Sequence, residues 1–305
     1  MTIIVGLVCK DCLVVAADSQ TTDGHTKRCD TQKISSVQFA DAQAVVAASG
    51  MSSLSNQAVA EFQKLAVGVE IKADDAIAQI AKDALFEVRR HQMEIYVHQY
   101  SLEQWQRFFR DDNPAELVVG YWFSDKPYLW KVSLHECVPI PSRCGYIISG
   151  VGGPLADYLL KEHFVAGVEP AAGAAIAAFV VEQVIANNST CGHPIRIAYL
   201  KKPIEPQRLA KMEEKLATSK HASEFLPELR DNVFVLSEDD IRQITEELYR
   251  IDSEIKTIRN GKIQQSLVIL TRGMLKRMIE GRATGSSTAS GTATDGPGPK
   301  QPGKP

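Results

Sequence analysis

The chain has 305 residues, of which 34 are lysine or arginine and 37 are aspartate or glutamate, so its formal net charge is −3. This length allows one large domain with an appendage, or two domains, and it excludes a peptide hormone or a small disulfide-stapled protein. With 44% hydrophobic and 23% charged residues, the chain has the composition of a globular protein with a sizeable core, and its small negative charge argues against nucleic acid or an anionic membrane as the main partner.

Short apolar runs bounded by turn residues predict β-strands near the start of the chain. These runs, the first two separated by the turn-forming pair Lys10-Asp11, are residues 3–8, 13–17 and 45–48. From Ser52 onward apolar residues recur at helical spacing, which predicts one helix capped by Ser52 or Ser53 and a second helix after residue 75.

The same alternation of element types repeats further along the chain. Strand-like runs lie at 117–123, 128–134 and 146–149, helical stretches at 155–163 and 171–186, and a last strand at 195–200. The order of strands, two helices, strands, two helices and a strand predicts sheets stacked on each other with paired helices outside, because a βαβ alternation is missing. We therefore predict an α+β fold.

Beyond residue 203 the composition becomes charged and helical. Isoleucines spaced by three and four residues follow a Ser237-x-x-Asp240 capping pattern and give a heptad-like seam over 241–258. Residues 283–305 consist mostly of small residues and proline and are too polar to form a core, so we predict disorder there. The predicted division is a domain over 1–204, a helical extension over 205–282 and a disordered tail over 283–305.

Several sequence patterns indicate the cellular compartment of the protein. The apolar stretch 171–186 contains Gly173 and Glu182 and is shorter than the ~20 residues that a membrane-spanning helix needs. The first residues lack the basic region and cleavage site of a signal peptide. We therefore expect a cytoplasmic protein without a membrane partner, whose six scattered cysteines stay reduced.

Metal and nucleic-acid motifs are weak in this sequence. Cys9-x-x-Cys12 spans a predicted hairpin turn with no second pair after it, so we interpret both residues as structural thiols. Residues 135–137 offer three ligand types, but neighbours on a strand point to opposite faces. Residues 89–91 are basic and are interpreted as a solvated helix end. We expect no metal, no cofactor and no nucleic acid.

The residue that points most directly to chemistry is Thr2. Methionine before a small residue is normally removed after synthesis, which would leave a hydroxyl and a free α-amine on the same terminal residue. An α-amine titrates at about 7.7–8.0, so near neutral pH it can accept the proton of its own threonine hydroxyl.

Four blocks in the first 50 residues together resemble the N-terminal segment of proteasome β-subunits and of the bacterial HslV peptidase. The blocks are residues 2–6, 14–22, 32–34 and 47–50. Two later segments are similar to the family's glycine-rich stretch before its third helix and to its Asp-x-x-Ser-Gly motif, namely residues 150–156 and 188–192. The resemblance covers about residues 2–200 and implies a four-layer αββα sandwich of the N-terminal-nucleophile hydrolase type.

The resemblance also implies a role for each matching residue. Thr2 would be the nucleophile, Lys33 would favour its deprotonation, and Asp18 would hold Lys33 in place. The backbone N–H of Gly50 would stabilise the oxyanion, and Thr22 would bind the extended substrate through its main chain.

Three positions depart from the pattern of active relatives. Val151 stands where they have a serine, although Ser149 could restore that hydroxyl in a shifted alignment. Asn188 stands where an aspartate supports the nucleophile, and Cys191 replaces a nearby serine with a weaker donor.

We interpret the chain as a threonine-type peptidase of a self-compartmentalising protease, with Asn188 as a supporting residue of the catalytic site. The family implies a homo-oligomeric ring, peptide or unfolded protein substrates, and an ATP-dependent unfoldase. The helical extension would then cover a neighbouring subunit, recruit a partner or dock on its own domain. Two alternatives stay open: a catalytically impaired structural subunit of such a ring, and an amidase that acts on small molecules through the same nucleophile.

Overall fold

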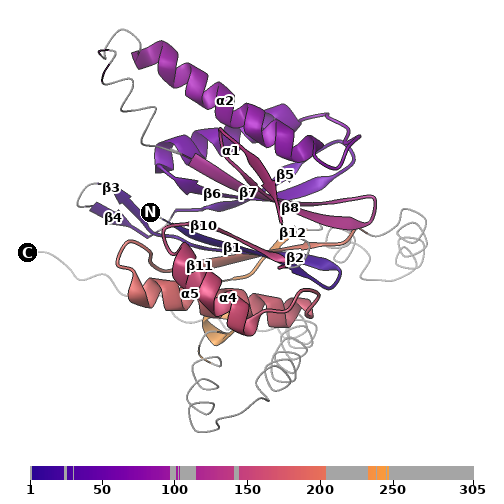
Figure 1. Cartoon of the computed structure of the whole chain (residues 1–305), viewed down its shortest axis with the longest axis vertical. Coiled ribbons are helices and arrows are strands. Elements are labelled where there is room, and N and C mark those ends of the chain that lie inside the picture. Colours follow the sequence, from indigo (N-terminus) through magenta and orange to yellow (C-terminus); the bar gives the residue numbers. More distant parts are fainter. Residues whose placement is uncertain are drawn as a thin grey trace, which may run out of the picture.

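The computed structural model describes residues 2–23, 26–29, 31–96, 101, 103, 115–140, 144–203, 233–237, 239–244 and 246. Two five-stranded antiparallel sheets lie face to face in this part of the chain, and helices cover their outer faces (Figure 1). The predicted four-layer αββα sandwich is confirmed.

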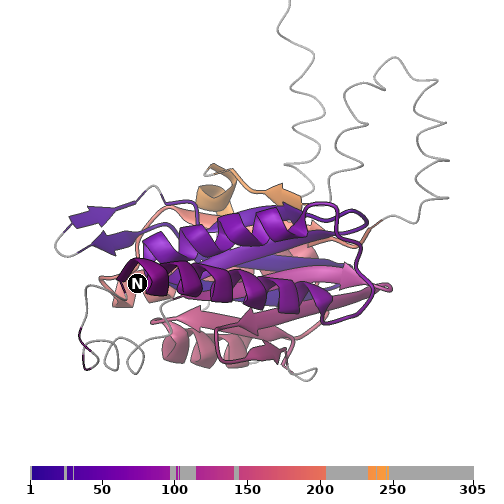
Figure 2. The ribbon, with the colours of Figure 1, turned by 90° about the horizontal axis from the view of Figure 1, so that it is seen from above.

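The first sheet, called sheet I, contains the N-terminal strand. Its order is β10 (Tyr146–Gly150), β1 (Ile3–Cys9), β2 (Cys12–Asp18), β11 (Ile195–Lys201) and β12 (Val233–Val235). The second sheet, sheet II, has the order β5 (Ile34–Gln38), β6 (Gln43–Gly50), β7 (Ala115–Phe123), β8 (Lys126–Val132) and β9 (Cys137–Pro139). A separate ribbon of β3 (Thr21–Asp23) and β4 (Thr26–Arg28) projects from one end of the sandwich (Figure 2).

Two helix pairs form the outer layers. Helices α1 (Ser52–Ala66) and α2 (Ala76–Tyr96) pack on sheet II, and α4 (Gly153–His163) and α5 (Pro170–Asn187) pack on sheet I (Figure 1). Pro170 lies in the first turn of α5, as predicted, where its missing N–H has no intrahelical partner to lose. The serine cap predicted for α1 is wrong, because its N-cap is Met51 and no side chain caps it.

Period-two alternation of apolar residues builds the three buried layers. Ile3, Val5 and Leu7 of β1 pack toward α4 and α5, whereas Ile4 packs between the sheets. Val46 of β6 likewise packs toward α1 and α2. Both faces of these central strands are buried, so their sequences read as continuous apolar runs.

Helix α5 is the one helix among the described residues that is long and apolar enough to cross a membrane by length and composition. It is 67% buried inside the protein, against the β1–β2 face of sheet I. The core helix of a soluble protein has this character as well, so its composition is explained by the packing.

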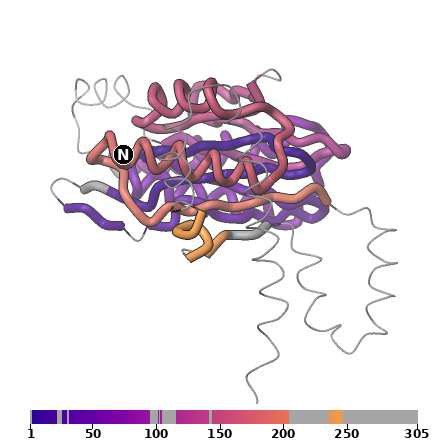
Figure 3. Tube along the Cα trace, turned by 90° about the horizontal axis from the view of Figure 1, so that it is seen from below, coloured from indigo at the N-terminus to yellow at the C-terminus, as the bar shows by residue number. Residues whose placement is uncertain are grey.

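The described part of the C-terminal extension docks on the chain's own domain. Strand β12 pairs antiparallel with β11 and forms the edge of sheet I, so this piece of the range predicted as helical is a strand. Ile241 and Ile244, the first two positions of the predicted seam, are buried in the cluster of α4, α5 and sheet I. Figure 3 shows the orange segment that follows β12 lying against the sandwich. The rest of the seam and the tail 283–305 lie outside the described residues.

We expect Ile244→Ala to lower the free energy of unfolding by about 2–5 kcal/mol, because it removes a fully packed side chain and leaves a cavity. The matched control is Gln243→Ala, an exposed neighbour in the same helical turn, whose effect should stay within about 0.5 kcal/mol. Urea denaturation of both full-length variants measures the difference. Equal midpoints for the two variants would contradict the docking of this segment.

Candidate active site

Three residues predicted from the sequence meet at one end of the sandwich. Thr2 directly precedes β1, Asp18 ends β2, and Lys33 directly precedes β5. Because β1 and β2 pair antiparallel, with Ile4 opposite Ala17, the beginning of β1 lies beside the end of β2. All three side chains are buried, with exposed fractions of 4% for Thr2, 0% for Asp18 and 7% for Lys33.

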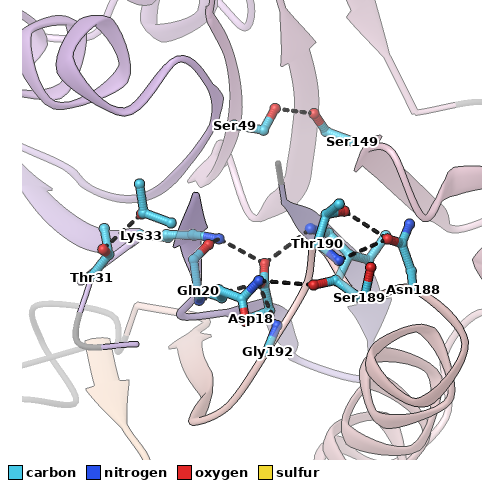
Figure 4. Close-up of polar contacts among 12 residues, drawn as sticks. Asp18, Gln20, Thr31, Lys33, Ser49, Ser149, Asn188, Ser189, Thr190 and Gly192 are labelled. Carbon is cyan, nitrogen blue, oxygen red and sulfur yellow. Dashed lines mark hydrogen bonds and ion pairs between the residues drawn. The ribbon is translucent and has the colours of Figure 1, made fainter. Parts of the chain in front are cut away.

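The carboxylate of Asp18 is the centre of the hydrogen-bond network (Figure 4). Its Oδ1 accepts from the Ile3 amide at 3.0 Å and from Lys33 Nζ at 2.8 Å. Its Oδ2 accepts from the amides of Gln20 at 3.2 Å and Gly192 at 3.1 Å. Four donors match the acceptor capacity of a carboxylate, so Asp18 is held in one orientation and in turn fixes the residue joined to Thr2.

Lys33 is held by two acceptors. Besides Asp18, its Nζ donates to the main-chain oxygen of Gln20 at 2.6 Å. Burial lowers the pKa of Lys33 below the usual lysine value, and the neighbouring Asp18 carboxylate opposes that shift. The ammonium is therefore desolvated and close to the terminus, where a positive charge favours deprotonation of a nearby hydroxyl or amine.

A cleft of about 540 Å³ opens at this place. Its lining combines the predicted residues Thr2, Lys33 and Gly50 with small and polar residues of α1 and of the β3–β5 region. The other lining residues include Thr21, Thr31, Gln32, Ala48, Met51, Ser55, Asn56 and Gln63. The structure thus places the predicted nucleophile, cation and oxyanion donor around one space.

Two glycines shape the main chain around Thr2. Gly50, at the end of β6, has a φ of +106°, a conformation that side chains rarely adopt. Gly150 lies against the Thr2 carbonyl so closely that a Cβ there would be 1.9 Å from its oxygen. The next amide, Val151 N–H, donates to that same oxygen at 2.9 Å. Thr2 is thus held through its backbone.

The departures from the family pattern serve other contacts. Asn188 caps the end of α5, and its Oδ1 accepts from the amide of Thr190 at 3.0 Å and from its hydroxyl at 2.6 Å. These bonds shape the loop that delivers the Gly192 amide to Asp18. Direct support of Thr2 by Asn188 stays a prediction.

Cys191 does not restore a hydroxyl, and Ser149 has other partners. Burial, with the Asp18 charge, raises the pKa of Cys191 to about 11, so it remains a thiol near neutral pH. Ser149 Oγ lies 2.6 Å from Ser49 Oγ and donates to Glu116 at 2.7 Å, apart from the Asp18 network (Figure 4). Restoration of the replaced hydroxyl by Ser149 stays a prediction, and Val151 contributes its amide to the Thr2 carbonyl.

Sequence reasoning missed several residues that the structure brings to the site. Gln20 and Gly192 contribute main-chain groups, which leave no pattern in side-chain chemistry. Thr21 lines the cleft and shares a hydroxyl contact of 2.7 Å with Thr31. The predicted Thr22 lies in β3 opposite Lys27, and its role in binding substrate stays a prediction.

The described residues contain no group of three histidine, cysteine, aspartate or glutamate side chains placed to hold a metal ion. Cys9 and Cys12 lie opposite each other across the β1–β2 turn as free, buried thiols. Burial raises the pKa of both thiols well above the usual cysteine value, to about 12 for Cys12.

Comparisons with known proteins agree with this fold. A family model described as "Proteasome subunit" matches residues 2–200. A search of curated proteins finds no match. Similar solved structures include an Anbu (Gly-1) mutant from Hyphomicrobium sp. strain MC1, with 12% identity, a TM-score of 0.60, and coverage of 86% of this chain and 99% of that one.

Two further solved structures show the same fold. Anbu, described as an ancestral beta-subunit, from Yersinia bercovieri has 12% identity and a TM-score of 0.60, covering 85% of this chain and 98% of its own. A helical assembly of the Anbu complex from Pseudomonas aeruginosa has 13% identity, a TM-score of 0.58, and the same coverage of 85% and 98%.

Proposed function

Because this chain belongs to the proteasome subunit family, we propose that it is a threonine-type peptidase whose nucleophile is Thr2 after removal of Met1. The observation that carries the proposal is the 2.8 Å pair of Lys33 with a fully buried Asp18, whose other bonds reach the residue next to Thr2. Burying a charged pair is unfavourable unless its geometry is good and its other groups are satisfied, so its presence beside the terminus calls for a role.

The proposed reaction transfers an acyl group twice. The α-amine of Thr2 takes the proton of its own Oγ, which attacks the substrate carbonyl, and the Gly50 amide donates to the oxyanion that forms. Collapse of this intermediate breaks the peptide bond, and the proton passes to the leaving amine. Water then attacks the acyl-threonine ester, with the α-amine again as base, and restores Thr2.

Lys33 supports these steps as a cation. Its charge stabilises the deprotonated hydroxyl and lowers the proton affinity of the amine, while Asp18 keeps it in place. The proposed reaction uses no cofactor.

The experiment that tests this proposal is labelling with a peptide epoxyketone, read by intact-mass spectrometry. The starting mass shows whether Met1 is removed, and we expect one adduct per chain on Thr2. A chain that retains Met1 and takes no adduct would contradict the proposal, because its amine would be one residue too far from Oγ.

A non-catalytic ring subunit is the second candidate, favoured by Val151 and Cys191 in place of two hydroxyls and by Asn188 in place of a carboxylate. Assembly without labelling would favour it, and labelled monomers would favour the small-molecule amidase. We propose that the chain assembles with copies of itself in the cytoplasm, and that it receives peptides or unfolded protein, with an ATP-dependent unfoldase as a further partner. Light scattering and electron microscopy of the purified chain test the assembly.

The pH profile should report on Lys33. Because its pKa is lowered and its charged form supports the reaction, activity is present below that pKa and is lost as pH rises through it. We therefore expect the alkaline limb of the pH profile of kcat to have its midpoint below about 10.4, which is the pKa of an exposed lysine. Lys64→Ala, which changes an exposed lysine of α1, is the control and should leave the profile unchanged. A limb at or above about 10.4 would contradict the assignment.

A further inference from the structure

Two buried serines connect the sheets next to the cleft. Ser49 of β6 in sheet II and Ser149 of β10 in sheet I place their Oγ atoms 2.6 Å apart (Figure 4). Their exposed fractions are 4% and 1%. Apolar side chains fill the layer between the sheets, and a hydroxyl without a partner there would be strongly unfavourable. A direct hydroxyl pair across this layer is therefore a specific connection.

The direction of the hydrogen bonds follows from the next partners. Ser149 Oγ lies 2.7 Å from Oε2 of Glu116, and that oxygen pairs with Lys131 Nζ at 3.1 Å. A carboxylate only accepts, so the single proton of Ser149 goes to Glu116. Ser49 must then donate to Ser149. The result is an ordered chain from Lys131 through Glu116 and Ser149 to Ser49, which we call the inter-sheet clasp.

At one end this clasp reaches the peptide group that carries the Gly50 amide. The carbonyl oxygen of Ser49 accepts from Ser55 Oγ of α1 at 2.9 Å. A trans peptide group is planar, with its C=O and N–H pointing in opposite directions. Fixing the Ser49 carbonyl toward Ser55 therefore fixes the direction of the Gly50 N–H.

Through Ser149 the clasp also reaches the main chain that holds Thr2. Ser149 directly precedes Gly150, which pairs with Ile3 of β1 and contacts the Thr2 carbonyl. Val151 donates to the same carbonyl. One hydroxyl pair thus joins the strand that presents the oxyanion donor to the strand that holds the nucleophile.

We propose that Ser49, Ser149, Glu116 and Ser55 are positioning residues that set the Gly50 N–H relative to Thr2 for acyl transfer. The inference rests on the proposed function. The described lining of the cleft includes Ser55 but not Ser49 or Ser149, so those two serines act through Gly50 and Thr2 rather than on substrate. Loss of one oxyanion donor lowers kcat by about 10²–10³-fold, and displacement of the donor causes a smaller loss of the same kind.

The test is Ser149→Ala in the full chain with a fluorogenic peptide. We expect kcat to fall about 10- to 100-fold with KM changed less than about 3-fold, because the lost interaction acts in the transition state. Ser49→Ala combined with Ser149→Ala should be no slower than the single variants, since the pair works as a unit. Should Ser149→Ala fail to fold, Ser49→Ala carries the same test and leaves Ser149 bonded to Glu116.

The matched control is Ser133→Ala. Ser133 is 2% exposed and directly follows β8 of sheet II, and its hydroxyl contacts Glu136 and the amide of His135, outside both clasp and cleft. We expect Ser133→Ala to lower Tm about as much as Ser149→Ala does and to leave kcat unchanged. Unchanged kcat in Ser149→Ala, or an equal fall in Ser133→Ala, would overturn the inference.

A readout that does not need activity separates this inference from the proposed function. Hydrogen exchange over residues 48–55 should be faster in Ser149→Ala than in wild type and in Ser133→Ala. If wild type takes no epoxyketone and cleaves no peptide, the proposed function fails, and the exchange comparison still decides whether the clasp holds the Gly50 peptide. Exchange equal in all three proteins would contradict the clasp.

Discussion

Thr2→Ala is expected to abolish peptide cleavage, with a loss of at least about 10³-fold in kcat, because no acyl ester can form without Oγ. The variant should still fold, since the contacts described for this residue run through its carbonyl oxygen and the neighbouring Ile3 amide. Two measurements check this, the hydrolysis rate of a fluorogenic peptide and the mass shift after epoxyketone treatment. Neither turnover nor an adduct on residue 2 should be seen.

Thr2→Ser is the matched control for that experiment. Serine retains both the hydroxyl and the α-amine, and methionine before serine is also a substrate for removal, so labelling should persist with reduced turnover. Full activity in Thr2→Ala would show that another group carries the reaction, and equal inactivity in both variants would point to a structural subunit.

Asp18→Asn is expected to lower kcat by about 100-fold or more and to destabilise the fold by about 3–5 kcal/mol. The amide nitrogen of asparagine would face donors, and the Lys33 ammonium would lose its buried counter-charge. Since Asp18 raises the pKa of Lys33 against the effect of burial, its removal lowers that pKa further. Urea denaturation and the pH profile of remaining activity measure the two effects.

The control for Asp18→Asn is Glu94→Gln. Glu94 pairs with Arg90 at 2.6 Å, but both side chains are more than half exposed. Solvent screens such pairs, so we expect a change within about 1 kcal/mol and unaltered activity. A similarly small effect of Asp18→Asn on stability and activity would contradict the proposal that the buried pair of Asp18 and Lys33 supports the nucleophile.

Strands with strong local signals were predicted well from the sequence, and weakly patterned strands were missed. β1, and β2 up to its final residue Asp18, lack charged residues because both of their faces are buried, so their runs were visible. β5, with the sequence ISSVQ and a mixed burial pattern, forms because it pairs with β6, a contact that no local pattern reveals. β12 was assigned to a helical extension because charged neighbours dominate its surroundings, whereas the edge of β11 selects a strand.

The candidate site divides in the same way. Thr2, Asp18, Lys33 and Gly50 were predicted because a family resemblance gave each residue type a role, and the structure brings them together. The Gln20 carbonyl and the Gly192 amide were not predicted, since any residue carries those groups. The clasp was missed because Ser49 and Ser149 are 100 positions apart and belong to different sheets.

The docking of β12 also bears on how this molecule is made. Synthesis proceeds from the N-terminus, so Lys201 leaves the ribosome well before Val233. Until then the outer margin of β11 has unpaired backbone groups and is open to pairing with other chains. Each nascent chain is therefore prone to pairing with other chains through β11 until its C-terminal part has been synthesised and β12 can cover that edge.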